Sequence, residues 1–216
     1  NIAHDLRTPL NRLRGQLENT RAQISKTDIP GAIADEMDEQ LAQSILDIDI
    51  LLENFAAILS LSRLESGAVA RSGVEVDLAA VVADIAELYE PVVQETGGCL
   101  DVLVRDKSAL VCGERTLISQ AIANLLENAL KYGASGKNIG LELSRREASH
   151  GVFYDIAVRD CGPGIAAADR ERAVARFVRL EPSRHLTGSG IGLSLVQAIA
   201  QLHGGALVLS GNLPHG

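Results

Sequence analysis

The feature that most constrains the fold is a long apolar seam in the first third of the chain. Apolar side chains recur there at alternating steps of four and three, at Leu41, Ile45, Ile48, Leu52, Phe55 and Leu59. This repeat is typical of a long helix that packs one stripe against another helix. We therefore expect a helix from about residue 32 to residue 65.

A second long helix is expected before this one. Ile2, Leu6, Leu13, Leu17 and Ile24 recur at helical spacing, which predicts a helix over residues 1–26. The segment 27–31 contains Asp, Pro and Gly and is expected to be a turn. Two helices joined by a short turn form an antiparallel hairpin. One hairpin has little core of its own, so we expect two copies to pair into a four-helix bundle, as a homodimer.

From residue 74 the pattern changes, so the fold class is α+β. Apolar periodicity predicts helices over 78–95, 114–132 and 191–203, and strands over 100–105, 139–143, 152–158 and 206–210. We expect two domains, residues 1–67 and 74–216, joined by a linker at 68–73. The polar, irregular segment 165–189 is long enough to be a functional lid.

Composition narrows the functional classes. The chain has 216 residues, of which 46% are hydrophobic and 22% charged, as in ordinary globular proteins. Its net charge of -8 argues against a nucleic-acid partner, because phosphate binding needs clustered Lys and Arg. No apolar run approaches the ~20 residues that span a bilayer. Cys99, Cys112 and Cys161 lack metal-ligand spacing and fit a reducing cytoplasm.

The first residue already lies inside the first expected helix, and the last expected strand is followed only by a turn. We therefore expect a fragment of a longer protein, with a sensor upstream and a final strand downstream both missing. Any membrane attachment would come only through the missing upstream segments.

A candidate nucleophile lies in the first helix. His4 is about 150° from the middle of the apolar stripe, so it is expected in solvent, where a core histidine would not be. Neutral imidazole is a good nucleophile near pH 7. Asp5 could orient the ring and accept its proton, or could be an ordinary surface carboxylate. Thr8 shares the face of His4, and Pro9 should bend the helix nearby.

Two amides mark a second candidate site. Asn124 and Asn128 are four residues apart, so their side chains share one face of the 114–132 helix. Amide oxygens are reasonable ligands for Mg²⁺ beside phosphate oxygens. Lys131 and Tyr132 follow one turn later and could reach a phosphate. The pattern predicts a site for a phosphorylated ligand.

Two glycine-rich segments complete this site. Asp160 ends a strand, and its carboxylate could accept a hydrogen bond from an adenine amino group, while Gly162 and Gly164 let the backbone approach. The same sequence is also frequent in turns. A second segment opens the last helix, whose exposed N–H groups can cradle a phosphate. Its glycines are Gly188, Gly190 and Gly192.

In this order the motifs 4–10, 124–132, 160–164 and 188–192 resemble the catalytic core of bacterial sensor histidine kinases. The resemblance covers nearly the whole chain. It implies a dimerisation and phosphotransfer hairpin, followed by an ATP-binding α/β sandwich of the GHKL (Bergerat) type. It further implies ATP and Mg²⁺ as cofactors, a response regulator as partner, and a cytoplasmic location as part of an inner-membrane sensor.

The resemblance also assigns roles. ATP would phosphorylate His4, with Asp5 accepting its proton, and the phosphoryl group would pass to an aspartate of the regulator. Thr8 would place a water for dephosphorylating that regulator, and Asn128 would hold the metal. Residues 176–179 resemble the family's F-box, which implies that Phe177 packs the lid down and that Arg179 approaches phosphate. The family usually has an amide residue where Cys161 stands.

Two alternatives remain at this point. ATPases of the same fold that hydrolyse ATP carry a Glu at the position of Asn124. An amide cannot act as a base. Glu127 is nearby, but it does not stand at the position of that Glu. This disfavours a GHKL-type ATPase or a phosphatase-only variant. A non-catalytic docking scaffold would be expected to lack His4, Asn128 or the glycines. The stimulus, the cognate regulator and the choice between cis and trans phosphorylation stay open.

Overall fold

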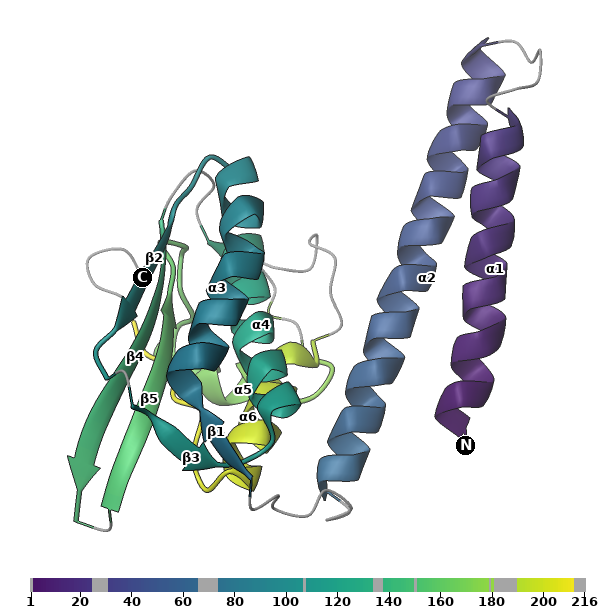
Figure 1. Cartoon of the computed structure of the whole chain (residues 1–216). Helices are drawn as coiled ribbons and strands as arrows, with labels where there is room; N and C mark the ends of the chain where they lie inside the picture. Colours follow the sequence, from purple (N-terminus) through teal and green to yellow (C-terminus); the bar gives the residue numbers. More distant parts are fainter. Residues whose placement is uncertain are drawn as a thin grey trace. The chain divides into compact units, whose positions relative to one another are not determined.

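The computed structural model describes residues 2–24, 31–65, 74–106, 108–133, 138–149, 151–178, 180 and 190–211. The contacts divide the chain into two compact units, with the boundary after Ser60. One is a pair of long helices, called the hairpin unit here. The other, called the mixed unit, contains all the strands (Figure 1). Each unit is described by itself.

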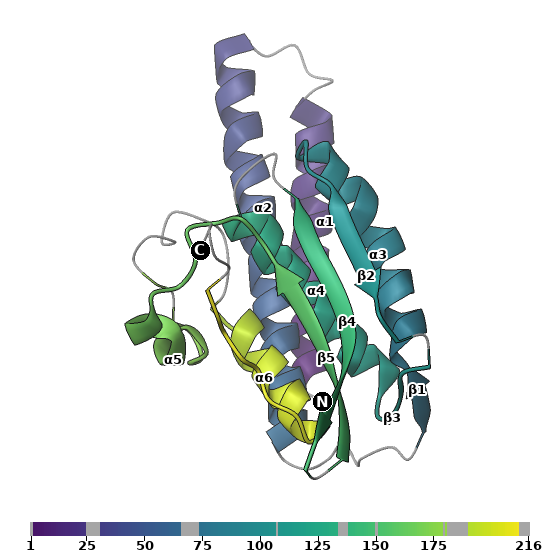
Figure 2. The same cartoon turned by 90° about the vertical axis from the view of Figure 1, so that its left-hand side faces the viewer.

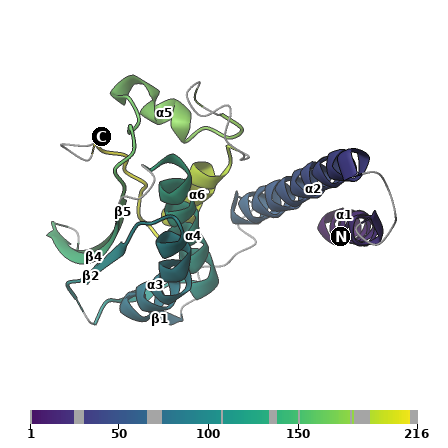
Figure 3. The same cartoon turned by 90° about the horizontal axis from the view of Figure 1, so that it is seen from above.

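The hairpin unit contains α1 (Ile2–Ile24) and the part of α2 (Gly31–Glu65) up to Ser60, and the two helices run side by side (Figures 1 and 3). Both predicted helices are confirmed. The expected turn lies outside the described residues except for Gly31, which begins α2. Among the described residues, no helix of either unit combines the length and the apolar character needed to cross a bilayer.

Two ion pairs join the helices of the hairpin. Arg14 Nε lies 3.1 Å from Asp49 Oδ1. Arg21 donates from Nε and Nη2 to the two oxygens of Asp38, at 2.6 and 2.9 Å. The earlier arginine pairs with the later aspartate, so the helices are antiparallel, as predicted. The Arg21 guanidinium also lowers the pKa of the Asp38 carboxyl, chiefly through the hydrogen bond.

The mixed unit has a three-stranded sheet of order β2-β4-β5, in which β2 and β4 are parallel and β4 and β5 antiparallel, and a separate β1-β3 pair (Figure 2). Its strands are β1 (Glu75–Asp77), β2 (Leu100–Val104), β3 (Leu110–Cys112), β4 (Ile139–Ala148) and β5 (Gly151–Arg159). Its helices are α3 (Leu78–Glu95), α4 (Arg115–Tyr132), the 3-10 turn η1 (Ala167–Asp169), α5 (Arg170–Ala173) and α6 (Gly192–Leu202).

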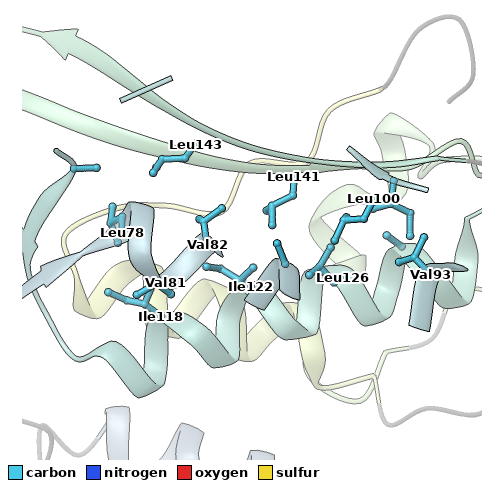
Figure 4. Packing of buried hydrophobic residues seen from close by; sticks show 14 of the residues in the cluster. Leu78, Val81, Val82, Val93, Leu100, Ile118, Ile122, Leu126, Leu141 and Leu143 are labelled. Carbon is cyan, nitrogen blue, oxygen red and sulfur yellow. The ribbon is translucent and has the colours of Figure 1, made fainter. Parts of the chain in front are cut away.

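The core lies between the sheet and the helices α3 and α4 (Figure 4). Alternation along β4 turns Leu141 and Leu143 inward, and both are fully buried. Helix α4 contributes Ile118, Ile122 and Leu126, four residues apart on one face. Burying each such side chain stabilises the fold by about 1.5–3 kcal/mol. The core also includes Leu78, Val81, Val82, Val93 and Leu100.

The predicted helices and three of the four predicted strands of the mixed unit are confirmed. Helix α3 begins where predicted because Asp77 Oδ1 accepts hydrogen bonds from the N–H groups of Ala79 and Ala80, at 2.9 and 3.4 Å. The pair β1-β3 was not predicted, because three residues are too few for an alternation to be recognised. Strand β4 continues five residues beyond the expected end at Leu143, where polar residues pair with β5.

The predicted strand over 206–210 is wrong, since these residues form no strand in the structure. The alternation that suggested it is present: Leu207 and Leu209 are half-buried and Val208 is 80% exposed. Alternation of apolar residues indicates which side chains are turned toward the rest of the mixed unit. It does not show whether the backbone pairs with a neighbouring strand.

The sheet face opposite the helices carries a charged cluster. Glu142 is buried on β4, and its Oε1 accepts a hydrogen bond from Arg105 Nε at 2.5 Å. Its second oxygen accepts one from Arg159 Nη1. These two bonds, that from Arg105 first, hold the pKa of the Glu142 carboxyl below its usual range.

We predict that Glu142→Gln lowers the free energy of unfolding at pH 7 and that this effect disappears in acid. The native pKa is depressed below the value of about 4.3 in the unfolded chain. The charged carboxylate therefore stabilises the fold above that pH, and the contribution is lost as the pH falls through the native pKa. Urea unfolding between pH 7 and pH 3 measures the difference. Glu147→Gln is the control, because Glu147 pairs with Arg145 in an exposed position. An effect of Glu142→Gln that does not change with pH would contradict the prediction.

Candidate functional site

The two predicted amides face the start of α6. Asn124 donates from Nδ2 to the carbonyl of Gln120 at 2.9 Å, which leaves its Oδ1 free of the helix backbone. A Cβ added to Gly192 would lie 3.3 Å from Asn124 Oδ1 and 3.7 Å from Asn128 Nδ2. The structure therefore brings Asn124, Asn128 and Gly192 together, and the absence of a side chain at Gly192 lets the start of α6 approach the amides closely.

The Asn128 side chain has an unsatisfied polar group. Its Nδ2 atom is buried and has no hydrogen-bond partner among the described residues. Leaving such a group unpaired costs about 1–3 kcal/mol. A polar ligand at the site would remove this cost, so the environment of Asn128 suits a bound polar molecule better than an apolar one.

The first turn of α6 borders the same space. The residue preceding the helix, Ile191, supplies no side-chain cap for its N–H groups. A helix start carries a partial positive charge and N–H groups without intrahelical partners, a combination that favours anions. Gly190 has a positive φ of 66°, which favours glycine. Gly188 lies outside the described residues.

The loop after β5 packs against the end of α4. Asp160 Oδ1 accepts a hydrogen bond from the N–H of Gly162 at 2.7 Å, which holds the loop in a tight turn. A Cβ at Gly162 would lie only 2.4 Å from the carbonyl oxygen of Tyr132 and 3.1 Å from Gly133 Cα. Only glycine permits this approach, so Asp160 is held beside the helix that carries Asn124. Gly164 has a φ of 71°, again a glycine conformation.

Lys131 and Tyr132 form a contact of their own. Lys131 Nζ lies 5.2 Å from the centre of the Tyr132 ring, within range of a cation–π interaction. Both side chains are half-buried at the end of α4. The predicted contact of Lys131 with phosphate stays a prediction.

Phe177 lies in the described part of the lid, and its side chain is 63% exposed. The predicted packing of the lid by Phe177 stays a prediction. The backbone of Phe177 has a positive φ of 61°, a strained conformation for a residue with a bulky side chain. The N–H of Phe177 donates to the carbonyl of Gly190 at 3.0 Å. A backbone bond therefore ties this part of the lid to the start of α6. Arg179 lies outside the described residues.

Comparison with known proteins places this geometry in a family. Residues 113–216 match the family described as "Histidine kinase-, DNA gyrase B-, and HSP90-like ATPase". Sensor protein IrlS of Burkholderia pseudomallei is 33% identical over 207 residues, covering 95% of this chain and 42% of the relative. The histidine-protein kinase/phosphatase MprB of Mycolicibacterium smegmatis is 32% identical over 213 residues, covering 99% of this chain and 41% of the relative.

Solved structures that resemble this chain include histidine kinases. Full-length ShkA in complex with AMPPNP has a TM-score of 0.72 at 26% identity, covering 98% of this chain and 42% of that one. The histidine kinase AdeS of Acinetobacter baumannii has a TM-score of 0.57 at 26% identity, covering 92% and 86%. The chain belongs to the sensor histidine kinases. It spans about two fifths of the length of the curated relatives named above and corresponds to the catalytic core.

The residues predicted to take part in phosphotransfer, His4, Asp5 and Thr8, belong to α1. Thr8 is exposed, as predicted. The side chains of His4 and Asp5 lie outside the described part of the structure, so their predicted orientation stays a prediction. Pro9 lies within α1, which continues on both sides of it.

Two residues of the candidate nucleotide site were not predicted from the sequence. Gln120 fixes the orientation of the Asn124 amide through its carbonyl. In a helix, the side chain of an Asn can hydrogen-bond to the backbone carbonyl four residues earlier, so this contact could have been predicted from the sequence spacing. Gly133 was recognised only as a helix end, yet a Cβ there would lie 3.3 Å from Asp160 Cβ. No local pattern reveals such a contact.

We predict that Gly162→Ala weakens binding of Mg²⁺–ATP by about tenfold. The new methyl would overlap the carbonyl of Tyr132 and push Asp160 away from α4; the strain also costs about 1–3 kcal/mol of stability. Calorimetric titration of the folded variant measures the affinity. Gly140→Ala is the matched control, since its Cβ would meet only Arg159 Cβ at 3.6 Å, an ordinary contact. Equal affinities for the two variants would show that the loop does not position the ligand.

Proposed function

We propose that this chain binds ATP in the mixed unit, transfers the γ-phosphoryl group to His4, and passes it to an aspartate of a response regulator. The observation that carries the proposal is the cluster of Asn124, Asn128 and Gly192 at the uncapped start of α6, in a chain of the histidine kinase family. The comparison structure of ShkA with AMPPNP supports ATP as the ligand class.

We further propose that Asn128 holds Mg²⁺ together with phosphate oxygens of ATP. No group of three or more His, Cys, Asp or Glu side chains among the described residues could hold a metal ion. A metal here would therefore depend on an amide oxygen and the nucleotide. Asn128 Oδ1 would ligate the ion, and the buried Nδ2, which lacks a partner among the described residues, would donate to a phosphate oxygen. When bound, the ion would neutralise charge on the phosphates.

The pocket favours holding ATP over hydrolysing it. Asn124 carries an amide, which cannot take a proton from water. The nearest carboxylate along the helix, Glu127, is exposed and accepts a hydrogen bond from the Tyr89 hydroxyl at 3.0 Å. Burial and the Glu127 charge raise the pKa of that hydroxyl, so it remains a donor. Glu127 is therefore directed to α3, which argues against the alternative of an ATP-hydrolysing relative.

The chemistry of the hairpin unit then follows from its residues. A ring nitrogen of His4 attacks the γ-phosphorus, the bond to the bridging oxygen breaks, and ADP leaves. Asp5 accepts the proton of the imidazole. Exposed Thr8 would place a water against a phosphorylated regulator. A relative named as a kinase/phosphatase supports this second activity.

The proposed organisation is a phosphotransfer domain over residues 1–67, a linker over 68–73 and a catalytic domain over 74–216. Both domains would act in the cytoplasm as part of a membrane-bound sensor. The kinase name of the relatives supports a response regulator as partner.

A homodimer is supported by the surface of α2. Beside the apolar seam of α2, four apolar residues are exposed by 36–52%: Ile33, Met37, Leu51 and Ile58. At 100° per residue they lie within about 60° of one another, on one side of the seam. An apolar stripe of this kind would be covered by a second hairpin in a four-helix bundle.

We predict that His4→Gln abolishes labelling by γ-labelled ATP while leaving ATP affinity unchanged, because the nucleophile and the pocket belong to different units.

Asn128→Ala should instead weaken Mg²⁺–ATP binding and lose the label as well. Labelling is measured as acid-labile, base-stable phosphate on the protein, and affinity by calorimetry.

The same preparations distinguish the proposed kinase from an ATPase and from a docking scaffold. ADP release without label by the unaltered chain would favour an ATPase, and ATP binding with neither product would favour a docking scaffold. Labelling of His4→Gln at the normal rate would show that another residue is the acceptor. Normal labelling of Asn128→Ala would show that its amide is not needed for the metal.

We predict that Leu51→Glu raises the dissociation constant of the dimer by about a hundredfold or more. Each protomer loses one apolar contact worth about 1.5–3 kcal/mol, and the symmetric interface contains it twice. Analytical ultracentrifugation of the full chain measures the constant. Leu46→Glu is the matched control, because Leu46 is 42% exposed but lies about 140° from Leu51. Dissociation by both variants alike, or by neither, would argue against this stripe as the interface.

A further inference from the structure

The end of α6 is joined to the beginning of α4 by one imidazole ring. His203, the residue that follows α6, accepts a hydrogen bond at Nε2 from the N–H of Glu114, at 3.1 Å. Its Nδ1 lies 2.8 Å from the carbonyl oxygen of Ile199 and donates to it. The two partners fix the neutral tautomer with the proton on Nδ1. Both ring nitrogens are therefore used.

The chain reserves space for this ring. A Cβ at Gly113 would lie 2.6 Å from His203 Cδ2 and 2.8 Å from Nε2, so only glycine allows the ring to reach the helix start. The Glu114 side chain already caps α4 by accepting from the N–H of Thr116 at 3.1 Å. The backbone N–H of Glu114 itself is satisfied by a residue 89 positions away.

The opposite end of α6 is the nucleotide site. The helix has 11 residues and is about 16 Å long, with Gly192 at its start against the amides of α4 and His203 after its end. Between these ends the two helices are in contact, and α6 buries the apolar residues Leu195, Val196 and Ile199. Apolar burial is not itself directional, so a hydrogen bond at one end of α6 adds a directional constraint on its axial position to that of side-chain packing. A slide by one residue would displace Gly192 by about 1.5 Å.

We propose that His203 is a positioning residue of the nucleotide site. Its hydrogen bond to Glu114 sets the axial position of α6 on α4, and so places the first turn of α6 against Asn124 and Asn128. The step from this placement to nucleotide binding rests on the proposed function. The placement itself does not, and is tested without nucleotide.

The test compares two substitutions in the full chain. In His203→Gln the longer amide can place an acceptor oxygen where Nε2 lies, and so keep the bond to Glu114. In His203→Asn the amide can still donate to Ile199 but is too short to reach Glu114. We expect His203→Asn to shift the backbone amide resonance of Gly192 and the side-chain amide resonances of Asn128 in ¹H–¹⁵N spectra of the nucleotide-free protein, and His203→Gln to leave them near their original positions.

Binding provides the second measurement. We expect His203→Asn to weaken Mg²⁺–ATP by about tenfold and His203→Gln to stay within about twofold of the unaltered chain. Val93→Ala is the control for general destabilisation, because Val93 is fully buried on α3. It should lower the melting temperature without moving the Gly192 resonance. If His203→Asn does not fold, Gly113→Ala displaces the same ring with His203 intact.

Unchanged Gly192 and Asn128 resonances in His203→Asn would overturn the proposal, and so would equal shifts in the Asn and Gln variants or in Val93→Ala. Selective shifts in a chain that does not bind Mg²⁺–ATP would leave the positioning role standing and refute the proposed function instead. Selective shifts with unchanged affinity would limit His203 to the placement of α6 and overturn its role in binding.

Discussion

The mixed unit depends on the two-sided character of α4. Its buried residues Ile118, Ile122 and Leu126 follow one another at steps of four and form the core beneath the sheet (Figure 4). Asn124 and Asn128 each follow one of these residues by two positions, about 200° round the helix, so burying the first set turns the amides to the opposite side. The core thus fixes the direction of the amides without any contact to them, and a helix that failed to pack would lose the site as well.

Long amphipathic elements were predictable from the sequence because their periodicity is repeated many times. The bounds of α3 agree with the prediction, and an N-cap Asp and a turn at residues 96 and 97 reinforce them. The failures concern features decided by distant partners. The β1-β3 pair is too short to show a period, and residues 206–210 show the period without the pairing. The backbone bond from the N–H of Phe177 to the carbonyl of Gly190 was not predicted either, since no local pattern reveals it.

The candidate site likewise has features that could be predicted from the sequence and features that could not. The residue types that suit a nucleotide were visible as short motifs, since each motif lies within a few residues of one element. The contacts that join them were not visible: Gly192 beside Asn124, Gly162 beside the carbonyl of Tyr132, and the ring of His203 in the space left by Gly113. Each joins segments at least 30 positions apart, so it exists only after the core has formed. Glycines report such contacts poorly in a single sequence, because a turn, a helix end and a close approach all require the same residue.

A kinase of the proposed kind needs a pocket that keeps ATP intact until a nucleophile from another unit reaches it. In the described pocket this follows from what the polar groups on α4 can do. Asn124 cannot act as a base, and Glu127 is directed to Tyr89. The Asn128 amide and the start of α6 can stabilise charge on a phosphate, but neither supplies the proton acceptor that hydrolysis needs. Binding and proton transfer are thus assigned to different units. In the proposed mechanism His4 and Asp5 on α1 would carry out the proton transfer, and the rate of ATP consumption would depend on how often the two units meet.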